Sequence, residues 1–455
     1  MKALNTLTLK CLCERSEAIS WDCFVVRLER TPRNDNFLFT ITIVLCLILY
    51  PGSFAFAEDL QLQDLINEAL KNNPEILAAQ SGAEAAKYRI PQARSLPDPM
   101  VMFGYQNEGW RKYTYGEMPD AQWMFSASQM FPFPGKRSLK GEMAEKDAGS
   151  LQASYDATRL EIIARVKNLY YDLFLAYKDI DLIKDKAYLF ARMEDAALAR
   201  YSSGMAPQQE VIMAQTEKYM LLEKEEMQKQ KIQALEGMLN TTIGRDVKSS
   251  LGRPLETNST EYRYTMDDLL ERAYEHSPEI KAKAKMIEGA GAKVRMAKKE
   301  YYPDFTINAG VAKKRGMFDD MWSLTSTINI PLYYRTKQRQ GVLEAESSLL
   351  EAKNELESTK FMISSALRDN YSMLKTAEQL TDLYKNALIP KIYQDFELAL
   401  AGYVTGKVEA ITVISRLKSL LDYDFLYWGQ FMEREKAIAR LEAITGATDS
   451  VLGSE

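Results

Sequence analysis

The chain carries DLINEALKNNPEI at residues 64–76 and, 204 positions later, DLLERAYEHSPEI at residues 268–280. Two further pairs recur in the same order: Pro97-Asp98 with Pro303-Asp304, and Tyr201-x-x-Gly204 with Tyr403-x-x-Gly406. Repetition at a nearly fixed spacing indicates a structural unit that is used more than once. We therefore predict a duplicated unit, with a first repeat at 58–255 and a second repeat at 256–446.

The two repeats are predicted to hold the same elements in the same order: an opening helix, a hairpin of two strands and two long helices. The opening helices span about 62–93 and 266–299. The hairpin strands are expected at about 100–107 and 121–131 in the first repeat, and at about 304–312 and 321–330 in the second. The long helices are expected at about 136–201, 207–240, 336–402 and 408–446, and residues 447–455 form a C-terminal tail.

The first long helix shows the spacing of a coiled coil. Apolar residues separated by alternating steps of four and three lie on one seam of a helix. The residues with this spacing are Ile162, Val166, Leu169, Leu173, Ala176, Ile180, Ile183, Ala187 and Phe190. In the second repeat, Pro390 predicts a kink in the corresponding helix.

The last hairpin strand alternates most regularly between apolar and polar residues. Its apolar residues are Leu324, Ile328 and Ile330, and its polar residues are Ser323, Thr325, Thr327 and Asn329. This period predicts a strand with two different faces, and strands of about ten residues of this kind suit a membrane barrel with a water-filled lumen. Four strands cannot close such a barrel, whose smallest type has about eight, so other chains would have to complete it. The alternative is a soluble sheet of two hairpins on a helical bundle.

The N-terminal region predicts export. Residues 37–50 are 14 residues without a charge, and Ala55-Phe56-Ala57 follows them as a cleavage pattern. We expect a signal peptide at 36–57 and exclude residues 1–35 from the fold as an N-terminal extension. A membrane anchor is the alternative, although the apolar run is shorter than the ~20 residues that a spanning helix needs.

Composition argues against several classes of function. The chain has 58 Lys and Arg against 63 Asp and Glu, so no general basic field favours nucleic acid as a partner. All four cysteines precede residue 47, and His276 is the only histidine, which excludes a histidine-rich metal site. Phosphate-binding loops, CxxC pairs and nucleophile elbows are absent, so we expect no enzyme, no cofactor and no resident metal.

Methionine is abundant, with 21 residues, and several of them surround the first hairpin. These are Met100, Met102, Met118, Met124 and Met130. Thioethers are soft ligands that suit Cu(I), but methionine also serves as a flexible filler of apolar cores. The sequence leaves both interpretations open.

Taken together, the duplication and three motifs resemble the TolC-type outer-membrane efflux protein family, the outer membrane factors of tripartite efflux pumps. The motifs are ALKNNPEI at 69–76, ARSLPDP at 93–99, and the pair Tyr201-x-x-Gly204 and Tyr403-x-x-Gly406. A further segment, FPFPGKR at 131–137, is similar to the heavy-metal efflux branch.

The resemblance implies a mainly α fold with a transmembrane β part. In this family three copies form a 12-strand outer-membrane β-barrel on a periplasmic tunnel of coiled-coil helices. The implied partners are a periplasmic adaptor protein, an inner-membrane transporter and outer-membrane lipid. The implied function is a passive exit duct for metal ions or small toxic compounds. The alternatives are the exit duct of a type I protein secretion system and a non-conducting coiled-coil scaffold of the envelope.

The resemblance also selects candidate functional residues. Tyr201, Gly204, Tyr403 and Gly406 correspond to the periplasmic tip that docks the adaptor, although both glycines also suit a plain turn. Family channels narrow at acidic rings six and nine residues after the second tip glycine, where this chain has Thr412 and Ser415. Glu210 and Glu409 are the nearby carboxylates for a gate or constriction, and solvated helix-face residues are the alternative.

Overall fold

A computed structural model describes residues 60–256 and 259–446, which belong to one of the two units of the chain, Ala57–Glu455. The extension expected at 1–35, the signal peptide expected at 36–57 and the tail expected at 447–455 lie outside the described residues.

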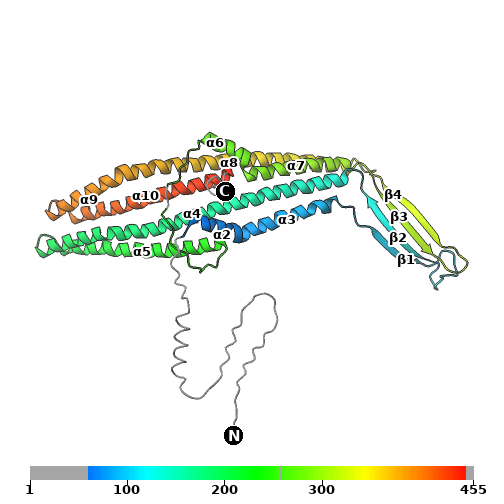
Figure 1. The fold of residues 1–455 in the computed structure, drawn as a ribbon, viewed down its shortest axis with the longest axis horizontal. Coiled ribbons are helices and arrows are strands. Elements are labelled where there is room, and N and C mark those ends of the chain that lie inside the picture. Colours follow the sequence, from blue (N-terminus) through cyan, green and yellow to red (C-terminus); the bar gives the residue numbers. More distant parts are fainter. Residues whose placement is uncertain (1–59, 257–258, 447–455) are drawn as a thin grey trace, which may run out of the picture. The chain divides into compact units, whose positions relative to one another are not determined.

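The described unit consists of long helices with a four-stranded antiparallel sheet beyond one end of them (Figure 1). In chain order the elements are α2 (Leu62–Asn72), α3 (Pro74–Arg94), β1 (Met100–Gln106), β2 (Gln122–Phe131), α4 (Lys136–Ser202), α5 (Gln208–Ile243), α6 (Met266–His276), α7 (Pro278–Lys299), β3 (Asp304–Lys313), β4 (Met321–Asn329), α8 (Gln338–Leu383), η1 (Tyr384–Leu388), α9 (Ile389–Val404) and α10 (Ala410–Thr445). The chain is mainly helical, and each half contributes two adjacent strands to one sheet.

The sheet has the strand order β1-β2-β3-β4, so β1 and β4 are its edges. Residues directly opposite each other in antiparallel strands share a face. One such row runs through Phe103, Phe125, Val311 and Trp322, and the next row, on the other face, runs through Met102, Ser126, Gly310 and Ser323. The register therefore gives the sheet one aromatic and aliphatic face and one face of small, polar and methionine residues.

Helix α4 organises the helical part, because α3, α5, α7 and α10 all pack against it. Seven of its nine predicted seam residues are buried, and only Leu169 and Ala187 are half-buried. The apolar core forms three clusters along the helices. One of them surrounds Phe396, Tyr403 and Leu417, near the turns that join α4 to α5 and α9 to α10. Within residues 60–256 and 259–446, no helix combines the length and the apolar character needed to cross a membrane.

The helical segment predicted at 336–402, with a kink at Pro390, corresponds to α8 and α9, which are joined by one π turn, η1. Pro390 lies at the start of α9, immediately after this turn. A proline has no backbone N–H and its ring clashes with the preceding turn, so the helix widens locally. The proline is therefore accommodated by a π turn that lets the helical segment continue to the tip.

Asp179 is a buried carboxylate on α4, with 8% of its surface exposed. Its Oδ1 atom has no hydrogen-bond partner in the described part of the chain. Burial raises the pKa of this carboxyl to about 6, against a smaller opposing effect of Lys231. The folded chain therefore binds this proton more tightly than the unfolded chain does, and its stability falls as the pH rises between about 4 and 6.

We expect Asp179→Asn to stabilise the protein at pH 7.5 by about 1–3 kcal/mol, because no buried charge then has to be desolvated. The gain should disappear below pH 4, where the carboxyl is protonated in both states. Thermal unfolding between pH 3.5 and 8 measures it. Asp185→Asn is the matched control, because Asp185 is exposed on the same helix. A gain from Asp179→Asn that is the same at every pH would contradict this account.

Candidate functional site at the helical hairpin tips

The two helical hairpins end in turns of the same construction. After α4, the Gly204 N–H donates to the Tyr201 carbonyl at 2.9 Å and the Met205 N–H donates to the Arg200 carbonyl at 2.8 Å. After α9, Gly406 and Lys407 repeat this pair of bonds at 2.9 and 2.8 Å. Gly204 has φ +72° and Gly406 has φ +75°, the left-handed conformation that glycine adopts without strain. Both turns are thus Schellman motifs that cap one helix and direct the chain into the next.

The repeat-related tyrosines occupy different environments. Tyr201 is 43% exposed, whereas Tyr403 is fully buried in the apolar cluster between the hairpins. The Tyr403 hydroxyl donates to Glu210 Oε2 at 2.6 Å, which joins α9 to α5. Burial, reinforced by this hydrogen bond to Glu210, raises the pKa of Tyr403. The hydroxyl therefore remains protonated and keeps donating to the carboxylate.

Arg200, at the end of α4, also connects the two tip turns. Its Nη1 donates to the Tyr403 carbonyl at 3.0 Å, and its Nη2 donates to the Met205 carbonyl at 3.2 Å. The guanidinium carbon lies 4.5 Å from the centre of the Tyr403 ring, within the range of a cation–π contact. Arg200, Glu210 and Tyr403 thus form one cluster, which we call the tip clasp.

The tip clasp includes a residue that the sequence did not single out. Arg200 corresponds to Gly402 in the second half, and Glu210 corresponds to Thr412. Both charged residues therefore occur only in the first half, and this asymmetry between otherwise similar turns is the signal that would have identified Arg200. Its partner, Tyr403, is about 200 residues away, so no local pattern reveals the contact.

The other predicted gate residues do not join the tip clasp. Glu409 and Ser415 are exposed and Thr412 is half-buried. In the part of the chain that the structure describes, their side chains form no hydrogen bond or ion pair. Glu210 is therefore the predicted gate residue that is held in place by a contact between the hairpins.

Ion pairs continue the connection between the hairpins away from the tip. Arg192 on α4 pairs with Glu397 on α9 at 3.3 Å, and Lys186 on α4 pairs with Asp424 on α10 at 2.9 Å. Between these two pairs in distance from the tip turns along the chain, Lys418 on α10 pairs with Glu217 on α5 at 3.2 Å. The first and third pairs are partly exposed, so each adds little to stability. Their placement still favours one alignment of α4 and α5 against α9 and α10.

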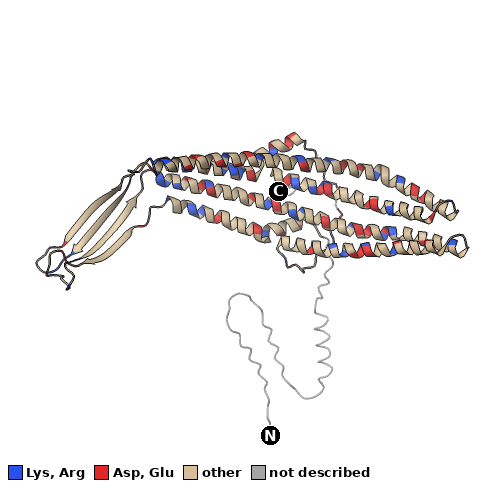
Figure 2. Cartoon of the chain, turned by 180° about the vertical axis from the view of Figure 1, so that it is seen from behind, with Lys and Arg blue, Asp and Glu red and all other residues tan. Residues whose placement is uncertain are grey.

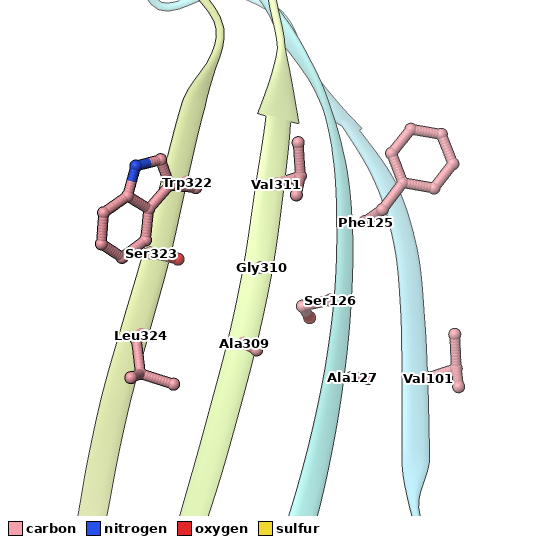
Figure 3. A pocket seen from close by; sticks show the side chains of 10 residues that line it. All are labelled: Val101, Phe125, Ser126, Ala127, Ala309, Gly310, Val311, Trp322, Ser323 and Leu324. Atoms are coloured by element: carbon pink, nitrogen blue, oxygen red, sulfur yellow. The ribbon is translucent and has the colours of Figure 1, made fainter.

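The two faces of the sheet are the second candidate region. On the apolar face, residues from all four strands line a shallow groove of about 520 Å³ (Figure 3). The residues that form its apolar lining include Val101, Phe125, Val311, Trp322 and Leu324. The opposite face carries five methionines: Met100, Met102, Met124, Met130 and Met321. Across residues 60–256 and 259–446, no group of three or more His, Cys, Asp or Glu side chains is arranged to hold a metal ion.

Comparison with known proteins gives a consistent result. The model of the outer membrane efflux protein family matches residues 65–244 and 269–421. The cobalt-zinc-cadmium resistance protein CzcC of Cupriavidus metallidurans is 22% identical over 402 residues, covering 86% of this chain and 91% of CzcC. The outer membrane protein TolC of Vibrio cholerae is 20% identical over 388 residues, covering 82% of this chain and 86% of TolC.

Among solved structures, the fold is similar to that of the outer membrane protein VceC of Vibrio cholerae, with a TM-score of 0.72. The two sequences are 20% identical, and the match covers 86% of this chain and 97% of VceC.

We expect Tyr403→Phe and Glu210→Gln to loosen the tip, because the first removes the hydrogen bond of a fully buried hydroxyl and the second replaces its carboxylate acceptor with a neutral amide oxygen. Hydrogen–deuterium exchange of the segments 196–212 and 396–412 should accelerate roughly 5- to 50-fold in either variant. The double variant should be little faster than Tyr403→Phe alone, because both substitutions act on the same bond.

Tyr201→Phe is the control for this experiment, because Tyr201 is the repeat-related tyrosine at the exposed position. It should leave exchange at the tip unchanged. Equal effects of Tyr201→Phe and Tyr403→Phe, or fully additive effects of Tyr403→Phe and Glu210→Gln, would show that the tip clasp is not a coupled unit.

Proposed function

The chain belongs to the outer membrane efflux protein family, and from this premise we propose that it is the passive exit duct of a tripartite efflux system. The resemblance to TolC-type proteins is thereby confirmed, and the chain is an outer-membrane protein with a helical part in the periplasm. The observation that carries the proposal is the two-faced sheet with open edges at the end of a long helical body. In this proposal the duct catalyses no reaction and holds no cofactor.

The open edges of the sheet support assembly from several copies. Among the described residues, strands β1 and β4 each have one unpaired side, and every residue of β4 is exposed. Unpaired backbone N–H and C=O groups cannot remain inside a lipid bilayer, so another chain must pair with each edge. Three copies give twelve strands, a number compatible with a closed barrel. The apolar face then contacts lipid, and the face with Ser126, Gly310 and Ser323 lines a hydrated lumen.

We place the adaptor protein and the gate at the tips. The exposed turns with Gly204 and Gly406 lie at the end of the helices that is far from the sheet (Figure 1). In the idle state the tip clasp holds the two hairpins of one chain together, and movement of α9 and α10 away from α5 has to break the bond between Tyr403 and Glu210. Threefold repetition of Glu210 adds a ring of carboxylates that would attract a cation.

Metal ions are the cargo that we favour, with a resistance-nodulation-division pump as the inner-membrane partner. The supporting observation is the similarity to CzcC, whose name assigns it to cobalt, zinc and cadmium resistance. A strain that lacks this chain should become sensitive to these cations and recover with the intact gene. Unchanged metal tolerance together with failure to secrete a protein substrate would instead support a type I secretion duct.

The conducting role is tested directly with purified protein in planar bilayers. A duct should show discrete channels whose conductance rises in Tyr403→Phe, where the clasp is weakened. Membrane-inserted protein without channels in both forms would contradict the proposal and favour a non-conducting scaffold.

We expect Leu324→Arg to prevent assembly in the membrane, because a charge on the lipid face near the bilayer midplane costs about 2–4 kcal/mol. Thr325→Arg is the matched control, since the neighbouring residue points to the opposite face. The amount of heat-resistant oligomer in outer-membrane fractions measures the effect. Normal assembly of Leu324→Arg, or loss of assembly only in Thr325→Arg, would show that the faces are assigned the wrong way round.

We expect Gly204→Val to abolish adaptor-dependent efflux while the barrel still assembles. A Cβ atom at this position meets no other atom within 4 Å, so the damage comes from forcing a β-branched residue to φ +72°. Gly204→Asn should retain most activity, because asparagine tolerates the left-handed conformation. Cation efflux in whole cells is the measurement, and normal efflux by Gly204→Val would exclude this turn from the docking end.

A further inference from the structure

Lys and Arg residues gather where the helices meet the sheet, whereas the strands carry almost no charge (Figure 2). The connecting segments at this junction are residues 94–99, 132–140, 298–304 and 330–340. They contain nine basic residues: Arg94, Lys136, Arg137, Lys140, Lys298, Lys299, Arg335, Lys337 and Arg339. They contain three acidic residues, Asp98, Glu300 and Asp304. We call this set of segments the basic collar.

The opposite ends of the strands lack this excess of positive charge. The loops 107–121 and 313–320 contain five basic residues, Arg111, Lys112, Lys313, Lys314 and Arg315. They also contain five acidic residues, Glu108, Glu117, Asp120, Asp319 and Asp320. The two ends of the sheet therefore differ by six charges per chain, although the whole chain has a net charge of -5. The excess of positive charge is therefore local to the collar end of the sheet and does not reflect the overall composition of the protein.

The collar's charge is only partly neutralised within the chain, where Arg94 pairs with Glu145 and Lys298 pairs with Glu346. Lys136 is buried and pairs with Asp304 at 2.9 Å and with Glu300 at 3.3 Å, so it stabilises the junction itself. Arg335, Lys337 and Arg339 are exposed, and within the described residues none of them forms an ion pair with a carboxylate. Their charges face solvent and are available to an anionic partner.

Exposed aromatic and aliphatic side chains lie between these cations. Tyr302 is 49% exposed, Tyr333 is 77% exposed and Leu332 is 75% exposed. Together with Ile330 and Lys337 they line a cleft of about 430 Å³ beneath the end of β4. Tyrosine beside lysine and arginine is the composition that favours a membrane–water interface, because an apolar body and a polar tip suit the headgroup region.

From this arrangement we infer that the basic collar binds the headgroups of anionic phospholipids in the leaflet that faces the helices. The inference rests on the proposed function, because the apolar sheet face must contact lipid for the collar to lie at headgroup depth. Phosphate oxygens would accept hydrogen bonds from Arg335, Lys337 and Arg339, and an acyl chain would start along Ile330 and Leu332. The neutral loops at the other end of the strands would show no such preference.

Binding is tested on the detergent-solubilised full-length protein, titrated with phosphatidylglycerol or phosphatidylcholine and analysed by native mass spectrometry. The collar variant is Arg335→Gln/Lys337→Gln/Arg339→Gln. The control variant, Arg111→Gln/Lys314→Gln/Arg315→Gln, loses the same three charges at the opposite end of the strands. An anionic surface favours each nearby basic residue roughly 5-fold, so we expect the collar variant to bind phosphatidylglycerol at least ~10-fold more weakly.

The expected result is that wild type and the control variant prefer phosphatidylglycerol to phosphatidylcholine, and that the collar variant has lost this preference. Soluble glycerol 3-phosphate should not compete at the same concentration. Equal binding of both lipids by wild type, an unchanged preference in the collar variant, or competition by glycerol 3-phosphate would overturn the inference.

Channel conductance of the same preparations separates this inference from the proposed function. If the collar variant conducts normally but has lost its lipid preference, the proposed function and the collar inference are both supported. If every preparation conducts and none prefers phosphatidylglycerol, only the collar inference fails. If wild type forms no channels in either lipid, the proposed function fails. The collar inference then fails too, because it requires the sheet to lie in the membrane.

Discussion

The unpaired backbone at the two edges of the four-stranded sheet is the constraint on which the rest of the structure depends. A sheet with one face of aromatic and aliphatic residues, including Phe125 and Trp322, is suited to lipid, but lipid leaves no partner for the N–H and C=O groups of β1 and β4. In the proposed assembly, closure by further copies would satisfy these groups. The duplication then acquires a physical role, because each repeat adds one hairpin to the sheet and one long helical hairpin to the body below it.

The two repeats differ at the tips, where opening and closing would take place. Both tips end in the same Schellman turn, yet only one tyrosine, Tyr403, is buried, and only the first half supplies a cation and a carboxylate to hold it. A symmetric pair of hairpins would bind each other equally on both sides. The asymmetric clasp instead ties α9 to α4 and α5 at the tip, beyond the ion pairs and the apolar cluster that also join the two hairpins.

The sequence predicted the parts of this fold that depend on local periodicity. The strand bounds differ from the predicted ones by at most one residue, because alternation in Trp322–Ile330 and its counterparts directly reflects two different environments. The π turn before Pro390 was missed, since proline predicts a disturbance but not its form. The contact of Arg200 with Tyr403 was missed because it depends on how two distant hairpins align. The basic collar was not predicted, because its basic residues come from four separate segments that only the folded junction brings together.

The central claim is that this chain forms a channel only together with other copies. The native mass of the protein, extracted from outer membranes in detergent, tests that claim most directly. We expect a single species of three copies, in which the edges of each sheet are paired with those of its neighbours. A monomer in the soluble periplasmic fraction would contradict the account, because four strands cannot form a closed barrel alone.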